Sequence, residues 1–180
     1  SCPSGMVGNA TRTCTNGVLS AIDTTSCVYP APSDLAYQNE EYVFTANVAA
    51  VVSRPSVNGK VDEFSIEPAL PTGLSFLAKD GSFAGSPSEE KASSAEYTVT
   101  ASSEAGSTTT TIKIVVELPK CAATADFPAT TIGESYTMDC SKVSGYKGTT
   151  TRTCEKSTNP GKGIWSAPAD YCIEKKLDVF

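Results

Sequence analysis

The chain has 180 residues, a formal net charge of −6 and no histidine. An acidic chain without a basic cluster is unsuited to nucleic acid and to anionic membrane surfaces, so we expect neither as a partner. The sequence contains no run of about 18 apolar residues, and we therefore expect no membrane insertion by this chain. The lack of histidine removes the commonest general base and zinc ligand, so we predict no enzyme activity, no cofactor and no metal.

Seven cysteines are many for this length, and they cluster at the two ends of the chain. They are Cys2, Cys14, Cys27, Cys121, Cys140, Cys154 and Cys172. Small domains that bury little apolar surface are commonly stabilised by disulfides, which persist in oxidising compartments. We therefore expect an extracellular protein, secreted or at a cell surface, in which two disulfide-rich segments flank a middle domain with a core of its own.

The two cysteine-rich ends share an internal repeat. The same motifs recur in the same order: Gly-x-x-Gly, Thr-Arg-Thr-Cys, Gly-(Val/Ile)-(Leu/Trp)-Ser-Ala and a closing cysteine. They lie at Gly5–Cys27 in the first copy and at Gly145–Cys172 in the second. The glycines mark turns and the threonines favour strands, so each copy is predicted to be a small β module. Leu19 and Trp165 are the predicted apolar centres of the two modules.

The second copy has a further cysteine upstream, and Gly163-x-Trp165 precedes its last cysteine. This outline resembles a sushi (complement control protein) module over roughly Cys121 to Cys172. The spacing from Cys121 to Cys140 is shorter than is usual in that family. We assign residues 120–175 to a sushi-like module and residues 1–30 to a partial module of the same kind.

Four cysteines allow three pairings, and their spacing does not choose among them. The sushi resemblance implies that the first pairs with the third and the second with the fourth. The repeat then extends this assignment to the first copy. The implied disulfides are Cys121–Cys154, Cys140–Cys172 and Cys2–Cys27.

Cys14 has no expected partner, because its counterpart Cys154 pairs with a cysteine that the first copy lacks. Three interpretations stay open. The chain is cut from a longer protein that holds the other half of the module, Cys14 bonds to another chain, or Cys14 is a buried free thiol. A catalytic thiol needs a base, usually histidine, and this chain has none.

Residues 31–119 show short alternating stretches separated by turns. Glu104–Ser107 is a predicted hairpin turn between two such stretches. About seven strands with regularly spaced turns are typical of an aligned sandwich. We therefore predict an all-β protein: an immunoglobulin-like β-sandwich with two small disulfide-rich β modules. The expected strands lie around Leu35–Tyr37, Tyr42–Val48, Phe64–Ile66, Leu74–Phe76, Phe83, Tyr97–Ala101 and Thr108–Val116, the last with Ile112, Ile114 and Val116 on one face.

Several ordered motifs of this middle segment carry a family resemblance. They are Leu70-Pro71-Thr-Gly73-Leu74, Gly85-Ser-Pro87 and Glu96-Tyr97-Thr-Val99. The segment looks like the "putative Ig" domain of surface and adhesion proteins, which is related to the dystroglycan-type cadherin-like fold. The resemblance covers nearly the whole middle segment and implies a sandwich without an intersheet disulfide.

Three further features are candidates for modification or binding. Asn9-Ala-Thr11 is an N-glycosylation sequon, so we predict a glycan on Asn9. Calcium binding through Asp62, Glu63 or Asp80 stays open because carboxylate oxygens suit that ion, although no regular calcium loop occurs. The alternating tail, residues 176–180, is a candidate strand for a neighbour's exposed sheet edge.

These features favour a non-enzymatic structural or adhesive module of an extracellular multidomain surface protein. A variant of this hypothesis is a protomer of an extracellular filament or appendage. The expected partners are other protein modules or copies of the chain itself. The alternative is an ectodomain that recognises a protein or a glycan.

Overall fold

The computed structural model describes residues 1–88 and 93–175 of the chain. The C-terminal tail, residues 176–180, lies outside the described residues. The described residues form β-strands and one 3₁₀ turn, η1 (Cys140–Lys142), so the prediction of an all-β protein is confirmed. Two compact units are distinguished. The first contains Ser1–Tyr42, Ala49–Gly85 and Ser94–Val115, and the second contains Val43–Val48 and the described parts of Ser86–Ser93 and Val116–Phe180.

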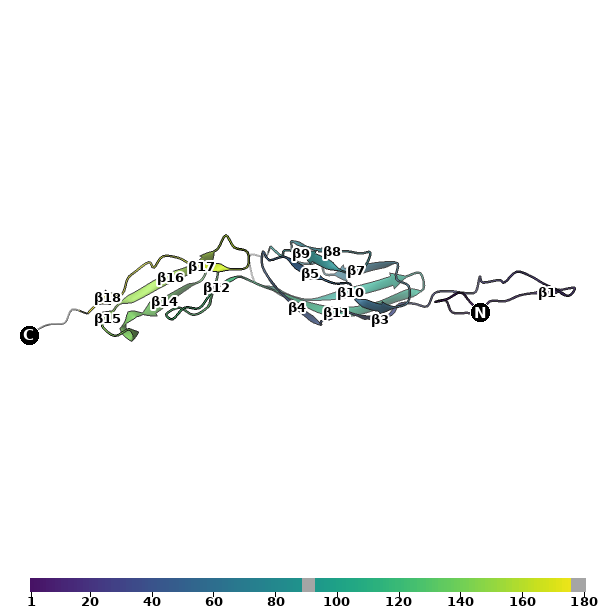
Figure 1. Cartoon of the computed structure of the whole chain (residues 1–180), viewed down its shortest axis with the longest axis horizontal. Coiled ribbons are helices and arrows are strands. Elements are labelled where there is room, and N and C mark those ends of the chain that lie inside the picture. Colours follow the sequence, from purple (N-terminus) through teal and green to yellow (C-terminus); the bar gives the residue numbers. More distant parts are fainter. Residues whose placement is uncertain (89–92, 176–180) are drawn as a thin grey trace, which may run out of the picture. The chain divides into compact units, whose positions relative to one another are not determined.

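The immunoglobulin-like sandwich is built from strands β3 to β11 (Figure 1). One sheet has four strands in the order β4-β11-β10-β7, a second has three in the order β5-β9-β8, and β3 pairs with β6. The strands are β3 (Ser33–Ala36), β4 (Glu41–Thr45), β5 (Ala50–Val52), β6 (Ser56–Asn58), β7 (Glu63–Glu67), β8 (Leu74–Phe76), β9 (Phe83–Gly85), β10 (Ser93–Ser103) and β11 (Gly106–Glu117).

The core of the sandwich follows from alternation along its two longest strands. Successive side chains of a strand point to opposite faces, so every second residue of β10 and β11 can be buried. Tyr97, Val99 and Ala101 of β10 are buried, as are Ile112 and Ile114 of β11. Val116, the third residue of the predicted apolar face of β11, is also fully buried, so that face is confirmed.

Aromatic side chains from both sheets meet in the first unit. The ring of Phe83 on β9 lies 5.9 Å from the ring of Tyr42 on β4, with an edge-to-face angle of 79°. Tyr37, which follows β3, packs its ring 6.1 Å from Phe83 and donates a hydrogen bond from its hydroxyl to the Gly81 carbonyl oxygen. These contacts seat the three-stranded sheet on the four-stranded one.

The structure corrects the number of strands in this region. About seven were predicted, and the described residues contain nine, β3 to β11. The two that were missed, β5 and β6, have three residues each and bury only Val52 between them. Strands so short cannot show a repeating apolar pattern, and they are fixed by pairing with β9 and β3 respectively.

The C-terminal cysteine module lies in the second unit. Its three-stranded sheet has the order β14-β16-β17, and two-stranded ladders join β12 to β13 and β15 to β18. The strands are β12 (Lys120–Cys121), β13 (Thr130–Thr131), β14 (Ser135–Asp139), β15 (Tyr146–Lys147), β16 (Thr149–Lys156), β17 (Gly163–Trp165) and β18 (Ile173–Glu174).

The N-terminal cysteine segment, residues 1–28, is a narrow ribbon in the first unit. Its hairpin joins β1 (Cys14–Thr15) to β2 (Val18–Leu19). Asn16 and Gly17 form the turn with φ angles of 50° and 78°, as a two-residue type I′ hairpin turn requires. Isolated bridges pair Val7 with Val28 and Thr11 with Asp23.

Candidate functional site: the two cysteine modules

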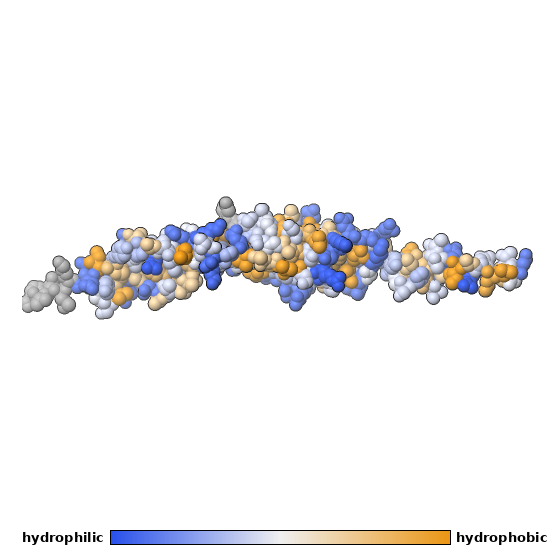
Figure 2. All heavy atoms as spheres, turned by 45° about the horizontal axis from the view of Figure 1, so that its top comes forward, coloured by the Kyte–Doolittle hydropathy of each residue, from blue (hydrophilic) through white to orange (hydrophobic). Residues whose placement is uncertain are grey.

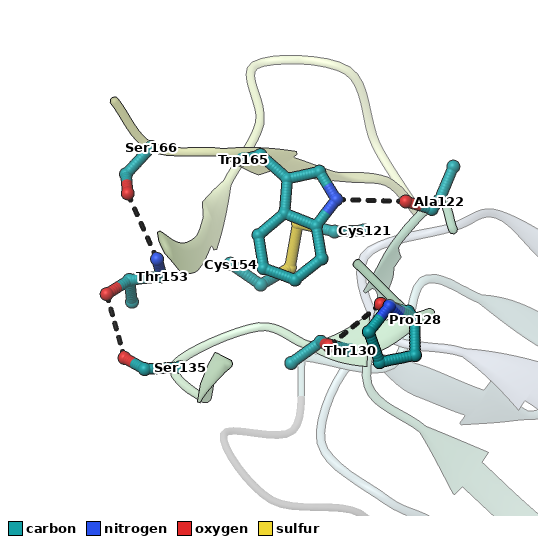
Figure 3. The surroundings of a disulfide bond; sticks show 9 residues. All are labelled: Cys121, Ala122, Pro128, Thr130, Ser135, Thr153, Cys154, Trp165 and Ser166. Atoms are coloured by element: carbon teal, nitrogen blue, oxygen red, sulfur yellow. Dashed lines mark hydrogen bonds between the residues drawn. A yellow bond between two sulfur atoms is a disulfide. The ribbon is translucent and has the colours of Figure 1, made fainter. Parts of the chain in front are cut away.

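Two disulfides hold the C-terminal module together. Cys121 is joined to Cys154, and Cys140 to Cys172. Cys121, Cys140 and Cys154 have no exposed surface. The Cys121–Cys154 bond joins β12 to the long strand β16 (Figure 3). It thereby connects two residues of the module that are 33 positions apart in the sequence.

An aromatic cluster covers this disulfide. The indole Nε1 of Trp165 donates a hydrogen bond of 2.9 Å to the carbonyl oxygen of Ala122, as Figure 3 shows. The ring of Phe127 lies 5.2 Å from the Trp165 ring and 6.0 Å from the Tyr136 ring. Phe127 is 6% exposed, and the guanidinium of Arg152 lies 5.3 Å above its ring. A guanidinium above the face of an aromatic ring is attracted electrostatically by the ring, so this contact stabilises the position of Arg152.

Phe127 is a central residue of the module that the sequence analysis did not single out. It lies between Cys121 and Cys140 in a stretch without period-two alternation, so no strand pattern marks it. Only the composition could have indicated its importance, because Phe127 and Tyr136 are the aromatic residues between Cys121 and Cys140.

The strand pair β14–β16 completes the module on its other side. Ser135 lies opposite Thr153 and Thr137 opposite Thr151, with hydroxyl-to-hydroxyl hydrogen bonds of 2.8 Å in both pairs. Cross-strand threonine and serine pairs of this kind stabilise a sheet. The threonine-rich stretch Thr149–Thr153 is therefore part of the sheet ladder.

The N-terminal segment has the same hairpin as the C-terminal module. Cys14 lies opposite Leu19 as Cys154 lies opposite Trp165. In the first copy the Ser20 amide donates to the Thr13 carbonyl at 2.8 Å, and the Thr13 amide donates to the Ser20 hydroxyl at 3.0 Å. The second copy repeats both hydrogen bonds between Ser166 and Thr153, at 2.9 Å and 3.0 Å.

The equivalence continues towards the closing cysteine. Val7 bridges to Val28 as Lys147 pairs with Ile173. The Asp23 amide donates to the Thr11 carbonyl at 2.8 Å, as the Ala169 amide donates to the Thr151 carbonyl at 2.9 Å. The disulfide Cys2–Cys27 occupies the place of Cys140–Cys172. The sequence repeat is therefore also a repeat of backbone pairing.

Two expectations about the N-terminal segment are wrong. Cys14 is an exposed free thiol, so the interpretation of a buried thiol fails. Leu19 is 58% exposed, so it is not the centre of a core. The physical reason is the same for both residues. In residues 1–28 nothing corresponds to Phe127 and the strands β12 to β14, which bury Cys154 and partly cover Trp165 in the other copy.

The remaining candidate residues are surface groups. Asn9 and Thr11 of the sequon are exposed. Hydrogen bonding from Lys60, with an ion pair of 2.8 Å, lowers the pKa of Asp62. Hydrogen bonds from Ser82 lower the pKa of Asp80. Within residues 1–88 and 93–175, no three acidic, histidine or cysteine side chains gather in a cluster that could hold a metal ion.

One family profile and several solved structures match parts of the chain. No curated protein sequence matches it. A solved structure, a chimeric titin Z1Z2 functionalised with a KLER exogenous peptide from decorin, is 22% identical, covers 49% of this chain and 95% of that chain, and has a TM-score of 0.37. Human protocadherin-24 EC1-2 is 10% identical, covers 80% of this chain and 96% of that chain, and has a TM-score of 0.44.

The sequence profile of the family described as "Putative Ig domain" matches residues 24–117, which is more than half of the chain. The matched range contains all nine strands of the sandwich. Disulfides and an Ig-like domain are consistent with an extracellular adhesive or structural protein. Among the described residues, no helix is long and apolar enough to span a membrane. The chain belongs to the Putative Ig domain family.

Proposed function

We propose that the chain is a non-enzymatic structural or adhesive module of an extracellular multidomain surface protein. In this proposal the Ig-like sandwich connects two sushi-like cysteine modules along the sequence, and the modules present contact surfaces instead of performing chemistry. The observation that carries the proposal is the repeated cysteine hairpin on either side of one Ig-like domain in the sequence. Small disulfide-bonded modules next to an Ig-like domain are typical of secreted and cell-surface proteins.

The connection between the N-terminal segment and the sandwich supports this role. The ammonium of Lys60 lies 5.6 Å from the centroid of the Tyr29 ring and forms an ion pair with Asp62. A Cβ on Gly59 would lie 3.3 Å from the Ala31 carbonyl oxygen and from the Cα of Pro32, so the linker backbone packs closely against this loop. Contacts of this kind, together with Pro30 and Pro32 in the stretch that joins the N-terminal segment to the sandwich, suit a stiff joint.

An adhesion assay tests the proposal. Beads coated with the full chain are expected to aggregate with one another or to attach to cell surfaces, and beads coated with the reduced and alkylated chain are not. The filament variant is tested by negative-stain microscopy at high protein concentration, where only single particles would count against it. Hydrolysis of a generic ester or peptide substrate that is lost on alkylation of Cys14 would overturn the non-enzymatic assignment.

The alternative function, recognition of a glycan or a soluble protein, makes a different prediction. Saturable binding of the monomeric chain on a glycan array, without bead aggregation, would favour that class. The experiment distinguishes the two because an adhesive module needs a surface-bound partner or another copy, whereas a ligand-binding ectodomain does not.

A further inference from the structure

One edge of the N-terminal segment has no strand beside it. Thr11 and Thr13 use their backbone groups to pair with Asp23 and Ser20. The alternate residues of this stretch are Ala10 and Arg12. In the described part of the chain, their backbone N–H and C=O groups make no hydrogen bond to protein. Residues alternate in direction along a strand, so these groups point to the opposite edge. An open edge is a template for another strand.

The C-terminal module shows what occupies this edge in the complete copy. There, β14 pairs with β16 antiparallel, from Ser135 opposite Thr153 to Asp139 opposite Thr149. Thr149–Thr153 corresponds to Asn9–Thr13 in the repeat. The edge that is open in the first copy is therefore the edge that β14 covers in the second.

Two side chains of the first copy lack the partners that their counterparts have in the second copy. Arg152 lies over the ring of Phe127, whereas its counterpart Arg12 is exposed and has no aromatic ring beside it among the described residues. Cys154 is joined to Cys121 and has no exposed surface, whereas its counterpart Cys14 is exposed and free. Phe127 and Cys121 both belong to the stretch that leads into β14. A backbone edge, an arginine and a cysteine thus lack partners that one continuous segment supplies in the other copy.

We propose that the edge Asn9–Thr13, together with Cys14, binds an extended polypeptide segment from outside residues 1–180. The segment has the chemistry of Cys121–Asp139: a cysteine that bonds to Cys14, an aromatic residue that packs under Arg12, and a strand rich in serine and threonine that pairs with Asn9–Thr13. This inference rests on the proposed structural role, since it names the kind of partner that such a module takes. The chain's own Cys121–Asp139 is not available, because it is part of the C-terminal module.

The covalent step is the oxidation of two thiols by a small disulfide such as oxidised glutathione. One thiolate attacks oxidised glutathione, forms a mixed disulfide and releases one reduced glutathione. The second thiolate attacks the protein sulfur of that mixed disulfide, the bond to glutathione breaks, and a second reduced glutathione leaves. Two thiols and one oxidised glutathione thereby give one protein disulfide and two reduced glutathiones. Strand pairing favours this product over the glutathione adduct of Cys14.

The test uses the full chain with its native disulfides and a synthetic peptide of residues 119–139. Both are incubated in a glutathione redox buffer, and intact mass and non-reducing peptide mapping measure the mixed disulfide. The peptide is expected to bond to Cys14 at least tenfold more than a scrambled peptide of the same composition. A peptide with Phe127→Ala is expected to lose most of that preference, and the Cys14→Ser chain is expected to form no adduct.

A second readout separates strand pairing from thiol chemistry. The Cys14→Ser chain is titrated with a Cys121→Ser peptide, and NMR is expected to show the largest amide shifts at Ala10 and Arg12. Equal adduct formation with the native and scrambled peptides, or amide shifts elsewhere only, would overturn the inference. Bead adhesion that persists in such a case would leave the proposed structural role standing, so the two failures are distinguishable.

Discussion

The indole Nε1 of Trp165 lies 2.9 Å from the carbonyl oxygen of Ala122 and donates a hydrogen bond to it. This bond connects β17 to the residue that follows Cys121. It fixes the indole beside the Cys121–Cys154 disulfide, as Figure 3 shows. The ring of Phe127 lies 5.2 Å from the indole. The tryptophan of the Gly-x-Trp motif thus links β17 to a segment far away in the sequence, in addition to filling space.

Trp165→Phe should destabilise the C-terminal module. The variant keeps an aromatic ring but leaves the Ala122 carbonyl without its donor, and a lost hydrogen bond of this kind costs about 1 kcal/mol. Amide exchange at Ser166, whose N–H is bonded to Thr153, measures the free energy of opening. Ile164→Ala is the matched control, because Ile164 is 57% exposed and should change that free energy by at most about 0.5 kcal/mol. Equal protection in the two variants would contradict the prediction.

Gly163→Ala should be more damaging than Trp165→Phe. A Cβ at this position would lie 2.5 Å from the Cys154 Sγ and 2.8 Å from the Cys121 Sγ. It would also lie 2.9 Å from the Cys121 backbone nitrogen, so neither the disulfide nor β12 can give way easily. We expect a loss of at least about 2 kcal/mol in the stability of the module, as for other overpacked sites.

The measurement for Gly163→Ala is a non-reducing peptide map together with amide exchange. A fraction of chains with free or mispaired Cys121 and Cys154 is expected. Gly133→Ala provides a contrast, since a Cβ there meets no atom within 4 Å, although its φ of +85° makes the variant strained by itself. A Gly163→Ala chain with native disulfide pairing and wild-type amide protection would contradict the prediction, because the module would then accommodate the added Cβ.

Tyr37 should make the sandwich sensitive to alkaline pH. Burial raises the pKa of its hydroxyl well above its ordinary value of 10, with Tyr42 and Asp80 adding to the effect. The folded state therefore holds this proton after the unfolded chain has released it. Stability from this group is fully present below about pH 10 and decreases as the pH rises above that value. Tyr37→Phe removes this dependence.

The variant also loses the hydrogen bond to the Gly81 carbonyl, at a cost of about 1 kcal/mol near neutral pH. Urea unfolding of the wild-type chain and of Tyr37→Phe between pH 8 and pH 11 should therefore give curves that converge as the pH rises. Tyr171→Phe is the control, because Tyr171 is 73% exposed. A constant difference between wild type and Tyr37→Phe across this range would contradict the titration argument.

The sandwich was predictable because its long strands carry a simple signal. Alternation along Tyr97–Ala101 and Thr108–Val116 selects the buried face directly, and burial follows it. The short strands β5 and β6 escaped because their positions are set by pairing with distant strands, which no local pattern encodes.

The cysteine modules show a different limit. The repeat identifies Leu19 with Trp165, and the register of the two hairpins supports the same equivalence. Equivalent positions were nevertheless assigned equal burial, which was wrong. The partial burial of Trp165 depends on Phe127 and Ala122, residues outside the repeated part. A repeat therefore transfers backbone pairing from one copy to another, but it transfers burial only when the covering segment is repeated as well.

Asn9 should carry an N-linked glycan when the chain is secreted from a eukaryotic cell. Asn9 and Thr11 are exposed, and Asn9 lies outside the strands of its ribbon, so the sequon is open to modification. Its counterpart Thr149 is exposed in the complete C-terminal module, where β14 is already paired. A glycan on Asn9 is therefore compatible with a strand on the adjoining edge.

Intact mass before and after removal of N-glycans measures occupancy, and Thr11→Ala should abolish the mass difference. Thr13→Ala, two residues further along, leaves the sequon intact and should not. A secreted chain whose mass is unchanged by the glycosidase would show that this exposed sequon is not used.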